Sequence, residues 1–331
     1  MDLKVGDEIE YFKLDRFISS FSSQQIWIAS LNDIQLKCQL IIKDNLVKDY
    51  ALLINQVLEI DDEKYIIKNR LGIGTFGCVH LIINEDDFRV FAMKVYPCKE
   101  DGEREYRYYN KLQDCSNIVK MIKPVHIGSH YGILMEKMEM DLYGKGMGFE
   151  LIMSVAKNVL TALKDIHSKL IVHGDIKLQN ILLDRNNIAY ICDLSNSYRR
   201  GSYVEEIGTI WFRSPENCDP NKMINNKGTN YYVIDYPSDI WGFGICFLSM
   251  FNDGKIPEFF KEFNPAQLLK KIGDQLSVDW EIEKIFKKYK SNIEYEFLVS
   301  LTKKLLTVDP NMRISSASAL EIIYPSEIME Y

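Results

Sequence analysis

The chain has 331 residues, of which 47% are hydrophobic and 26% charged, as in a globular protein with a sizeable core. Its formal net charge is −7, and the 40 basic and 47 acidic residues are interspersed, so no basic block indicates nucleic acid or a membrane as a partner. The most apolar stretch, residues 240–250, is shorter than the roughly 20 residues that a membrane span needs. Seven cysteines, without C-x-x-C spacing, favour a reducing compartment over a disulfide scaffold or a zinc site. We therefore expect a cytoplasmic protein, with the nucleus as the alternative.

Residues 1–64 precede the motifs described below and form an N-terminal extension. Residues 11–18, 26–29 and 40–43 parallel parts of residues 65–94 in sequence pattern. Serines at positions 19, 20, 22 and 23 stand where glycines would be needed to approach a phosphate, so this copy should not bind one. Two interpretations stay open: a β-rich extension, or a decayed strand repeat that packs on the strands that follow.

Residues 71–79 (LGIGTFGCV) indicate a strand, a glycine-rich turn and a second strand. Glycines at positions 72, 74 and 77 let backbone N–H groups approach phosphate oxygens without a Cβ in the way. The same glycine spacing occurs in dinucleotide-binding motifs, but there a helix follows the turn. Here residues 78–83 (CVHLII) are β-branched and apolar, which predicts a hairpin.

A lysine and a carboxylate follow the glycine-rich turn. Lys94 lies in an expected strand, residues 91–95 (FAMKV). Residues 103–112 predict a helix, and Glu105 lies on the side of it that carries apolar residues. We therefore expect Glu105 to pair with Lys94. Because only 11 residues separate the two, Glu103 stays open as the alternative partner.

An amphipathic helix leads into a polar loop. Apolar residues recur with a helical period over residues 149–169, which predicts a helix with one buried face. Residues 173–180 (HGDIKLQN) then bring a candidate base, a cation and a metal-binding amide within eight residues. Asp193 ends the apolar run 188–192 and is a second candidate metal ligand. Phosphoryl transfer from ATP needs this combination of an acid, a cation and Mg²⁺ ligands.

In this order, the motifs resemble those of the protein kinase family. Residues 208–216 (GTIWFRSPE) are similar to the end of its activation segment. Residues 238–244 (SDIWGFG) are similar to its buried central helix, on which Asp239 would anchor the catalytic loop. The resemblance also implies that Glu216 pairs with Arg313, about a hundred residues away.

Three positions depart from the family pattern. Ser195 replaces the glycine that usually stands two residues after the metal-binding aspartate, and it lacks glycine's freedom at positive φ. Gly174 stands where kinases controlled by phosphorylation of the activation segment carry a phosphate-binding arginine. The usual phosphate acceptor position falls at Val204, which has no hydroxyl, although Ser202 and Tyr203 are alternative acceptors. We therefore expect activity without phosphorylation of this segment.

The resemblance implies an α+β fold of two lobes in a catalytic domain at residues 65–331. The small lobe, residues 65–136, would hold antiparallel strands with one helix, and the large lobe, residues 139–331, would be mainly helical. ATP and Mg²⁺ are the implied cofactors. The implied catalytic residues are Asp175, Lys177, Asn180, Lys94, Glu105 and Thr209, and Mg²⁺ would be held by Asn180 and Asp193. The implied nucleotide-binding residues are Leu71, Gly72, Gly74, Gly77, Val79, Ala92, Lys94, Met135, Glu136 and Met138.

The implied activity is that of a serine/threonine protein kinase acting on Ser and Thr hydroxyls of protein substrates. The chain is a divergent member most similar to the cyclin-dependent and mitogen-activated group. Ile210 replaces the arginine that many of that group carry, so a preference for proline after the acceptor does not follow. Residues 217–237 are polar and predict a surface loop. Nothing in the sequence indicates the oligomeric state.

Two other functions stay open. Small-molecule phosphotransferases also tend to read His-Gly-Asp in the catalytic loop, as this chain does at residues 173–175. A non-catalytic scaffold with the same fold is the second alternative. It would be favoured by the loss of a catalytic lysine, aspartate or asparagine, and none of these is missing here.

Overall fold

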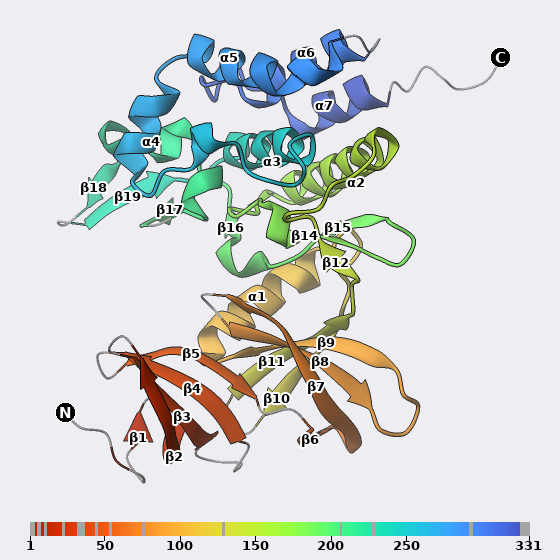
Figure 1. The fold of residues 1–331 in the computed structure, drawn as a ribbon, viewed down its shortest axis with the longest axis vertical. Helices are drawn as coiled ribbons and strands as arrows, with labels where there is room; N and C mark the ends of the chain where they lie inside the picture. The colour runs from red at the N-terminus through yellow and green to blue at the C-terminus, as the bar shows by residue number, and fades with distance from the viewer. Residues whose placement is uncertain are drawn as a thin grey trace. The chain divides into compact units, whose positions relative to one another are not determined.

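The computed structural model describes residues 4, 8–9, 12–21, 24–31, 37–43, 46–52, 55–74, 77–127, 130–205, 207–226, 229–290 and 294–324. The chain forms two compact units (Figure 1). The first unit comprises residues 1–110 and 120–137, and the second comprises residues 111–119 and 138–331.

The first unit is built on a six-stranded antiparallel sheet and one helix, α1 (Lys99–Lys111). The strand order is β10-β11-β9-β8-β7-β6. The strands are β6 (Val57–Ile60), β7 (Glu63–Gly74), β8 (Gly77–Asn84), β9 (Val90–Tyr96), β10 (Met121–Ile127) and β11 (His130–Glu136). Strands β7 and β8 pair as a hairpin up to Gly74 and Gly77, so the glycine-rich turn joins two strands, as the sequence predicts.

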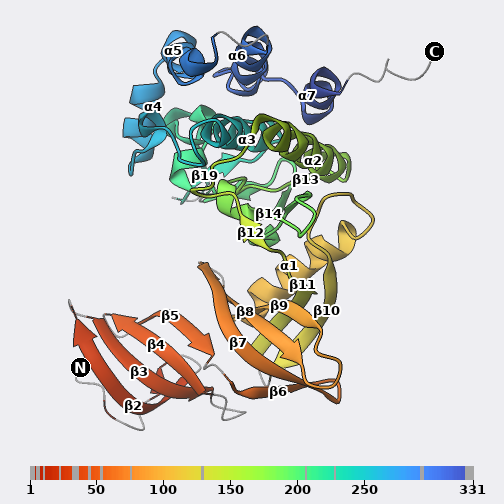
Figure 2. The same cartoon turned by 45° about the vertical axis from the view of Figure 1, so that its right-hand side comes forward.

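A second sheet precedes this one in the chain (Figure 2). Its strands, in spatial order, are β1 (Glu8–Ile9), β2 (Phe12–Phe21), β3 (Gln24–Leu31), β4 (Lys37–Lys43) and β5 (Leu46–Leu52). Leu14 of β2 and Trp27 of β3 belong to the same buried cluster as Ile67 of β7 and Ile82 of β8. The extension therefore shares a hydrophobic core with the six-stranded sheet.

The second unit is mainly helical, and two of its helices carry the functional loops. Helix α2 (Phe149–Ser168) buries the apolar stripe that its period predicts, including Val155, Val159 and Leu163. Helix α3 (Pro237–Met250) is buried along almost its whole length, which fits its continuous apolar sequence. The other α-helices among the described residues of this unit are α4 (Pro265–Ile272), α5 (Gln275–Phe286), α6 (Tyr295–Leu305) and α7 (Ser316–Ile323).

Short strands connect these helices. They are β12 (Met140–Asp141), β13 (Ile171–Val172), β14 (Ile181–Leu183), β15 (Ala189–Ile191), β16 (Tyr198–Arg199), β17 (Tyr203–Val204), β18 (Ile224–Asn226) and β19 (Thr229–Val233). They form three small antiparallel sheets, in the orders β12-β14-β15, β13-β16 and β17-β19-β18.

The prediction that residues 217–237 form a surface loop is wrong. Strands β18 and β19 pair within this stretch, and β19 also pairs with β17. The physical reason is an alternation that favours a strand: Tyr232 and Ile234 are buried, whereas Val233 between them is 42% exposed.

The predicted pair between Glu216 and Arg313 is present. The guanidinium donates from Nη1 to Glu216 Oε1 over 2.8 Å and from Nη2 to Oε2 over 2.9 Å. It also donates to the backbone oxygens of Pro237 and Thr307, over 2.6 and 2.8 Å. One buried cation thus joins the end of the activation segment to the start of α3 and to the turn after α6.

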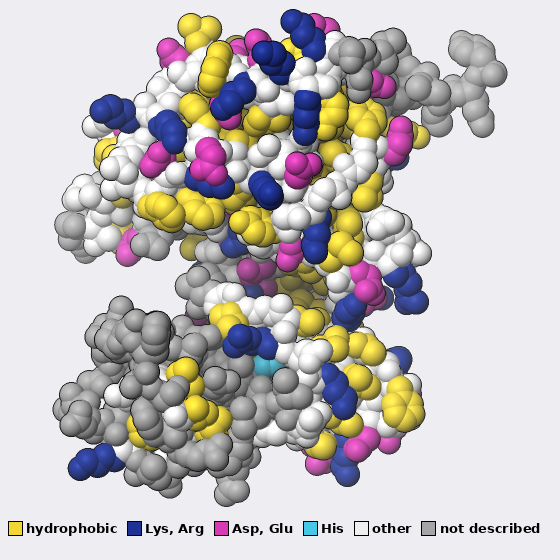
Figure 3. Space-filling view, in the orientation of Figure 1, with side chains coloured by type: hydrophobic (Ala, Val, Ile, Leu, Met, Phe, Trp, Pro, Cys, Tyr) yellow, Lys and Arg dark blue, Asp and Glu magenta, His cyan; other side chains and the backbone are white. Residues whose placement is uncertain are grey.

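No helix among the described residues combines the length and the apolar character needed to cross a membrane. Acidic and basic side chains are interspersed on the visible face of the second unit (Figure 3), in line with the mixed charge of the sequence.

His80 of β8 makes the stability of the fold sensitive to acid. Its side chain is fully buried, and burial together with the nearby charge of Arg70 lowers the pKa of His80 to about 4. The unfolded chain binds this proton near pH 6.5, so the folded state holds fewer protons than the unfolded state between these values. Stability should therefore fall by about 2 kcal/mol from pH 7 to pH 5 because of this residue.

Urea unfolding at pH 7, 6 and 5 measures this effect. We expect the His80→Leu variant to lose most of the pH dependence, and a variant of the exposed His126, His126→Gln, to keep it. Equal pH dependence in wild type and His80→Leu would contradict the assignment.

Candidate active site

The glycine-rich turn contains two kinds of glycine. A Cβ at Gly77 would lie 2.3 Å from the backbone oxygen of Val95, so the pairing of β8 with β9 requires glycine there. A Cβ at Gly72 would meet no described atom within 4 Å, and one at Gly74 would meet only the oxygen of Gly77, at 3.8 Å. Neither glycine has a positive φ. Packing among the described residues therefore does not explain Gly72 and Gly74, whereas close approach of a phosphate to the backbone does. Thr75 and Phe76, at the tip, lie outside the described residues.

Lys94 and Glu105 form a buried ion pair in the first unit. The distance from Lys94 Nζ to Glu105 Oε2 is 2.7 Å, and the two residues are 5% and 0% exposed. Glu103, the alternative partner, instead lies 3.5 Å from the exposed Lys99. A buried ion pair contributes little net stability because both charges lose water. Its position behind the glycine-rich turn suits a cation held for phosphate oxygens.

The other predicted nucleotide-binding residues of the first unit lie on the strands around Lys94. Ala92 is on the same strand as Lys94, and its strand partner Met135 is the next to last residue of β11. Both are buried. Leu71 is 48% exposed near the end of β7, and Val79 is half-buried on β8. Glu136 ends β11 and is exposed, while Met138 belongs to the second unit and is half-buried.

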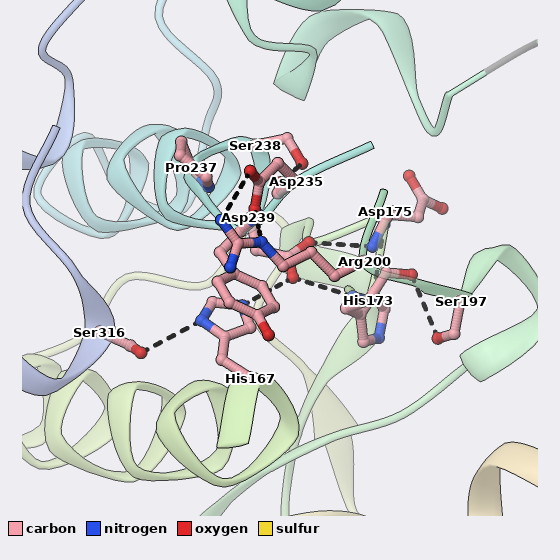
Figure 4. A network of polar contacts seen from close by, with 12 residues as sticks. His167, His173, Asp175, Ser197, Arg200, Asp235, Pro237, Ser238, Asp239 and Ser316 are labelled. Atoms are coloured by element: carbon pink, nitrogen blue, oxygen red, sulfur yellow. Dashed lines mark hydrogen bonds and ion pairs between the residues drawn. The ribbon is translucent and has the colours of Figure 1, made fainter. Parts of the chain in front are cut away.

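In the second unit, Asp239 of α3 fixes the backbone of the catalytic loop (Figure 4). Its Oδ2 accepts from the amide of His173 over 2.8 Å, and its Oδ1 accepts from the amide of Gly174 over 2.9 Å. His167 Nε2 lies 3.0 Å from Oδ2, and His167 Nδ1 lies 3.2 Å from Ser316 Oγ. Asp239 is 2% exposed, so these contacts replace the water that its carboxylate loses.

The structure brings Asp175, Lys177, Asn180 and Thr209 together. Asp175 Oδ1 accepts from the amide of Thr209 over 2.7 Å, and Oδ2 accepts from Lys177 Nζ over 2.6 Å. Lys177 Nζ also donates to Thr209 Oγ1 over 3.0 Å. Asn180 Nδ2 donates to the backbone oxygen of Asp175 over 2.9 Å, which orients the asparagine side chain. A carboxylate held in this way can take up a proton from a hydroxyl, and the cation beside it can offset negative charge.

Asp193 and Asn180 supply oxygen ligands of the kind that Mg²⁺ prefers. The amide nitrogen of Asn180 is used within the loop, so its Oδ1 is left for a cation. The backbone of Asp193 is left-handed, with φ 63° and ψ 77°. The amide of Cys192, next to Asp193, donates to the backbone oxygen of Asn180 over 3.0 Å, which ties the two ligand-bearing loops together. The donor set therefore fits a magnesium ion.

Ser195 contributes a contact that the sequence did not predict. Its hydroxyl donates to Asp193 Oδ1, and the residue is 4% exposed. Ser195 is not among the described residues with positive φ, so its Cβ causes no backbone strain in this conformation. The departure from the family glycine therefore places a hydroxyl on one oxygen of the candidate metal ligand.

Two glycines let the activation segment contact the catalytic loop. Gly174 has φ +81°, and a Cβ there would lie 2.3 Å from the backbone oxygen of Asn196. Gly208 has φ +45°, and a Cβ there would lie 2.4 Å from the backbone oxygen of Gly174 and 3.0 Å from Asp175 Oδ1. A side chain at either position would have to displace a backbone oxygen in this conformation, so the backbone here disfavours the phosphate-binding arginine that other kinases carry at the position of Gly174.

Comparison with known proteins agrees with this geometry. A family model described as "Protein kinase domain" matches residues 65–324. A probable serine/threonine-protein kinase MRK1 homolog of Encephalitozoon cuniculi is 30% identical over 215 residues, which cover 61% of this chain and 64% of that protein. The serine/threonine-protein kinase fused of Drosophila melanogaster is 28% identical over 205 residues, which cover 56% of this chain and 24% of that protein. The chain thus matches less than two thirds of the length of either relative.

The fold is shown by a solved structure as well. The crystal structure of a kinase domain matches 80% of this chain and 95% of its own, with a TM-score of 0.59 and 19% sequence identity. The expected two-lobed α+β kinase fold is therefore confirmed.

The contact between Gly174 and Asn196 can be tested with two alanine variants. Gly144 has φ +68°, and a Cβ there would meet no described atom within 4 Å, so Gly144→Ala introduces left-handed strain alone, of about 1–2 kcal/mol. Gly174→Ala must also displace the oxygen of Asn196, which should destabilise the protein by about 2 kcal/mol more. Chemical unfolding measures both variants. Equal destabilisation would show that the backbone contact at Gly174 is not tight.

Proposed function

This chain belongs to the protein kinase family, and we propose that it transfers the γ-phosphoryl group of Mg-ATP to serine or threonine hydroxyls of proteins. The observation that carries the proposal is the arrangement around Asp175, whose two carboxylate oxygens are bound by Thr209 and Lys177. Thr209 belongs to residues 208–216, the segment that resembles the polypeptide-positioning part of protein kinases. This supports a protein acceptor over a small molecule.

In the proposed reaction, Asp175 accepts a hydrogen bond from the acceptor hydroxyl, orients its oxygen towards the γ-phosphorus, and takes up its proton. Lys177 offsets the negative charge that develops on the transferred group. Asn180 and Asp193 would hold Mg²⁺, which neutralises phosphate charge when bound. Lys94, held by Glu105, would bind the α- and β-phosphates, and the backbone at Gly72 and Gly74 would cover them.

A non-catalytic scaffold is the weaker proposal. Lys94 is paired, Asp175 is bound on both oxygens, and Asn180 is oriented by the loop. A protein that had lost catalysis would have no physical reason to keep a buried ion pair and an orienting network at these positions. We also propose, on sequence resemblance alone, a place near the cyclin-dependent and mitogen-activated group.

Substitution of the two aspartates tests the activity. Asp175→Asn and Asp193→Asn should each lower kcat on the order of a thousand-fold on a serine/threonine peptide library, because each acts on transition-state charge. The variant Asp114→Asn changes an exposed carboxylate outside the site and should be unaffected. Circular dichroism checks that each variant is folded. An Asp193→Asn protein with full activity would refute the proposed metal site.

We further propose that activity does not depend on phosphorylation of the activation segment. Gly174 leaves no arginine before the catalytic aspartate, and Val204, at the usual acceptor position, is 3% exposed and lacks a hydroxyl. The test is to produce the protein in bacteria, treat it with a phosphatase, and confirm by mass spectrometry that residues 193–216 are unmodified. The unmodified protein should retain its turnover. If activity disappears and returns only when Ser202 or Tyr203 is phosphorylated, the proposal is wrong.

A further inference from the structure

The activation segment is held by a strand that the compact pattern of the family does not predict. Strand β17 pairs antiparallel with β19, with Tyr203 opposite Val233 and Val204 opposite Tyr232. Two backbone hydrogen bonds extend the pairing: Gly201 N donates to Ile234 O over 2.9 Å, and Ile234 N donates to Ser202 O over 3.1 Å. Residues 201–204 therefore have the backbone partners of a sheet rather than those of a free loop.

Apolar side chains seal the same contact. Val204 and Ile207 from the activation segment pack with Tyr232 and Ile234 from the hairpin and with Val172 of β13. All five are at most 7% exposed. Burial of this cluster removes apolar surface from water only while the segment stays on the hairpin, so it favours the ordered state.

An ion pair and a ring stack fix the segment at its other end (Figure 4). Arg200 donates from Nε to Asp235 Oδ1 over 2.8 Å and from Nη2 to Oδ2 over 3.2 Å. Its guanidinium lies 4.7 Å from the ring centre of Tyr236, and that ring stacks on His167 at 4.5 Å. His167 in turn contacts Asp239, which holds the catalytic loop. Because the guanidinium donates to both carboxylate oxygens, this exposed pair fixes the orientation of Arg200 better than a single surface hydrogen bond would.

The segment held in this way leads directly into the site. Ile207 of the apolar cluster is followed by Gly208, whose backbone lies against Gly174, and by Thr209, whose amide binds Asp175. In kinases switched by phosphorylation, a phosphate bound to an arginine orders this segment. Here the ordering contacts come from residues 229–235, which we call the β19 brace.

We propose that Ile234 and Asp235 of the β19 brace are positioning residues for the catalytic base: they hold residues 200–207 so that Thr209 meets Asp175 without a bound phosphate. The inference rests on the proposed kinase activity and names the part of the chain that makes this activity independent of phosphorylation. It also gives a role to residues 217–237, a stretch that is longer here than in compact members of the family.

The experiment uses the full chain, produced in bacteria and treated with phosphatase. Ile234→Ala removes a buried side chain of the brace, and Val233→Ala removes the exposed side chain that precedes it in the chain, so the two form a matched pair. Turnover is measured on a serine/threonine peptide library, and amide exchange of residues 201–209 is measured by mass spectrometry. We expect Ile234→Ala to lower kcat at least tenfold, to leave the KM for ATP within twofold, and to speed exchange of these amides at least tenfold. Val233→Ala should change each quantity less than twofold.

The ion pair is tested by charge reversal. Arg200→Asp and Asp235→Arg should each lower kcat about fivefold, and the double variant should restore at least half of the wild-type value, because the two charges are then paired again. The control Glu205→Gln removes a neighbouring carboxylate that has no polar partner among the described residues, and it should not change kcat.

The outcomes separate this inference from the proposed function. If the wild type transfers no more phosphate than its Asp175→Asn variant, the proposed function fails, and the exchange rates alone then decide whether the brace orders the segment. If Ile234→Ala and Val233→Ala behave alike in turnover and exchange, the inference is overturned. It is also overturned if Ile234→Ala raises kcat, because the hairpin would then inhibit the site.

Discussion

The site depends first on one buried carboxylate, that of Asp239. It sits on a helix that is apolar around almost its whole surface, so it must be satisfied by donors from the protein. Those donors are the amides of His173, which donates to Oδ2, and of Gly174, which donates to Oδ1. His167 Nε2 also contacts Oδ2. The need to satisfy a buried charge therefore sets the course of the catalytic loop before any ligand is considered. Asp175 directly follows Gly174, so the backbone held by Asp239 also fixes the position of Asp175.

The absence of a side chain at Gly174 has two consequences that belong together. It lets the backbone oxygen of Asn196, at the start of the activation segment, lie against the catalytic loop, and it removes the side chain that would bind an activating phosphate. A segment without phosphate still has to be ordered, at an entropic cost of about 1–2 kcal/mol per residue. The pairing of β17 with β19 and the cluster around Ile234 supply contacts that offset this cost. Glycine at position 174 thus removes the phosphate-binding side chain, and the hairpin of β18 and β19 supplies contacts that order the segment without a phosphate.

Much of the site could be predicted because its residues are fixed by chemistry at set spacings. The pair of Glu105 with Lys94 was expected because a buried lysine needs a carboxylate partner, and the pair of Glu216 with Arg313 was expected from the resemblance to the family motifs. Ser195 was missed as a partner of Asp193 because that contact depends on the left-handed backbone at Asp193, which residue types do not reveal. The hairpin at β18 and β19 was missed because its polar composition outweighed the short alternation around Tyr232, although that alternation was a readable signal. The domain boundary at residue 65 stays a prediction, and β6, which starts at Val57, already belongs to the six-stranded sheet.

The central claim, that Asp239 fixes the catalytic loop and through it the activation segment, is tested most directly by residue-resolved amide exchange in the unphosphorylated protein. In the wild type, the amides of Gly174 and Thr209 should be among the slowest to exchange, because each donates to a carboxylate in the site. In an Asp239→Asn variant that remains folded, the account predicts that both amides lose protection together. Loss of protection at Gly174 alone, with Thr209 as slow as in the wild type, would contradict it.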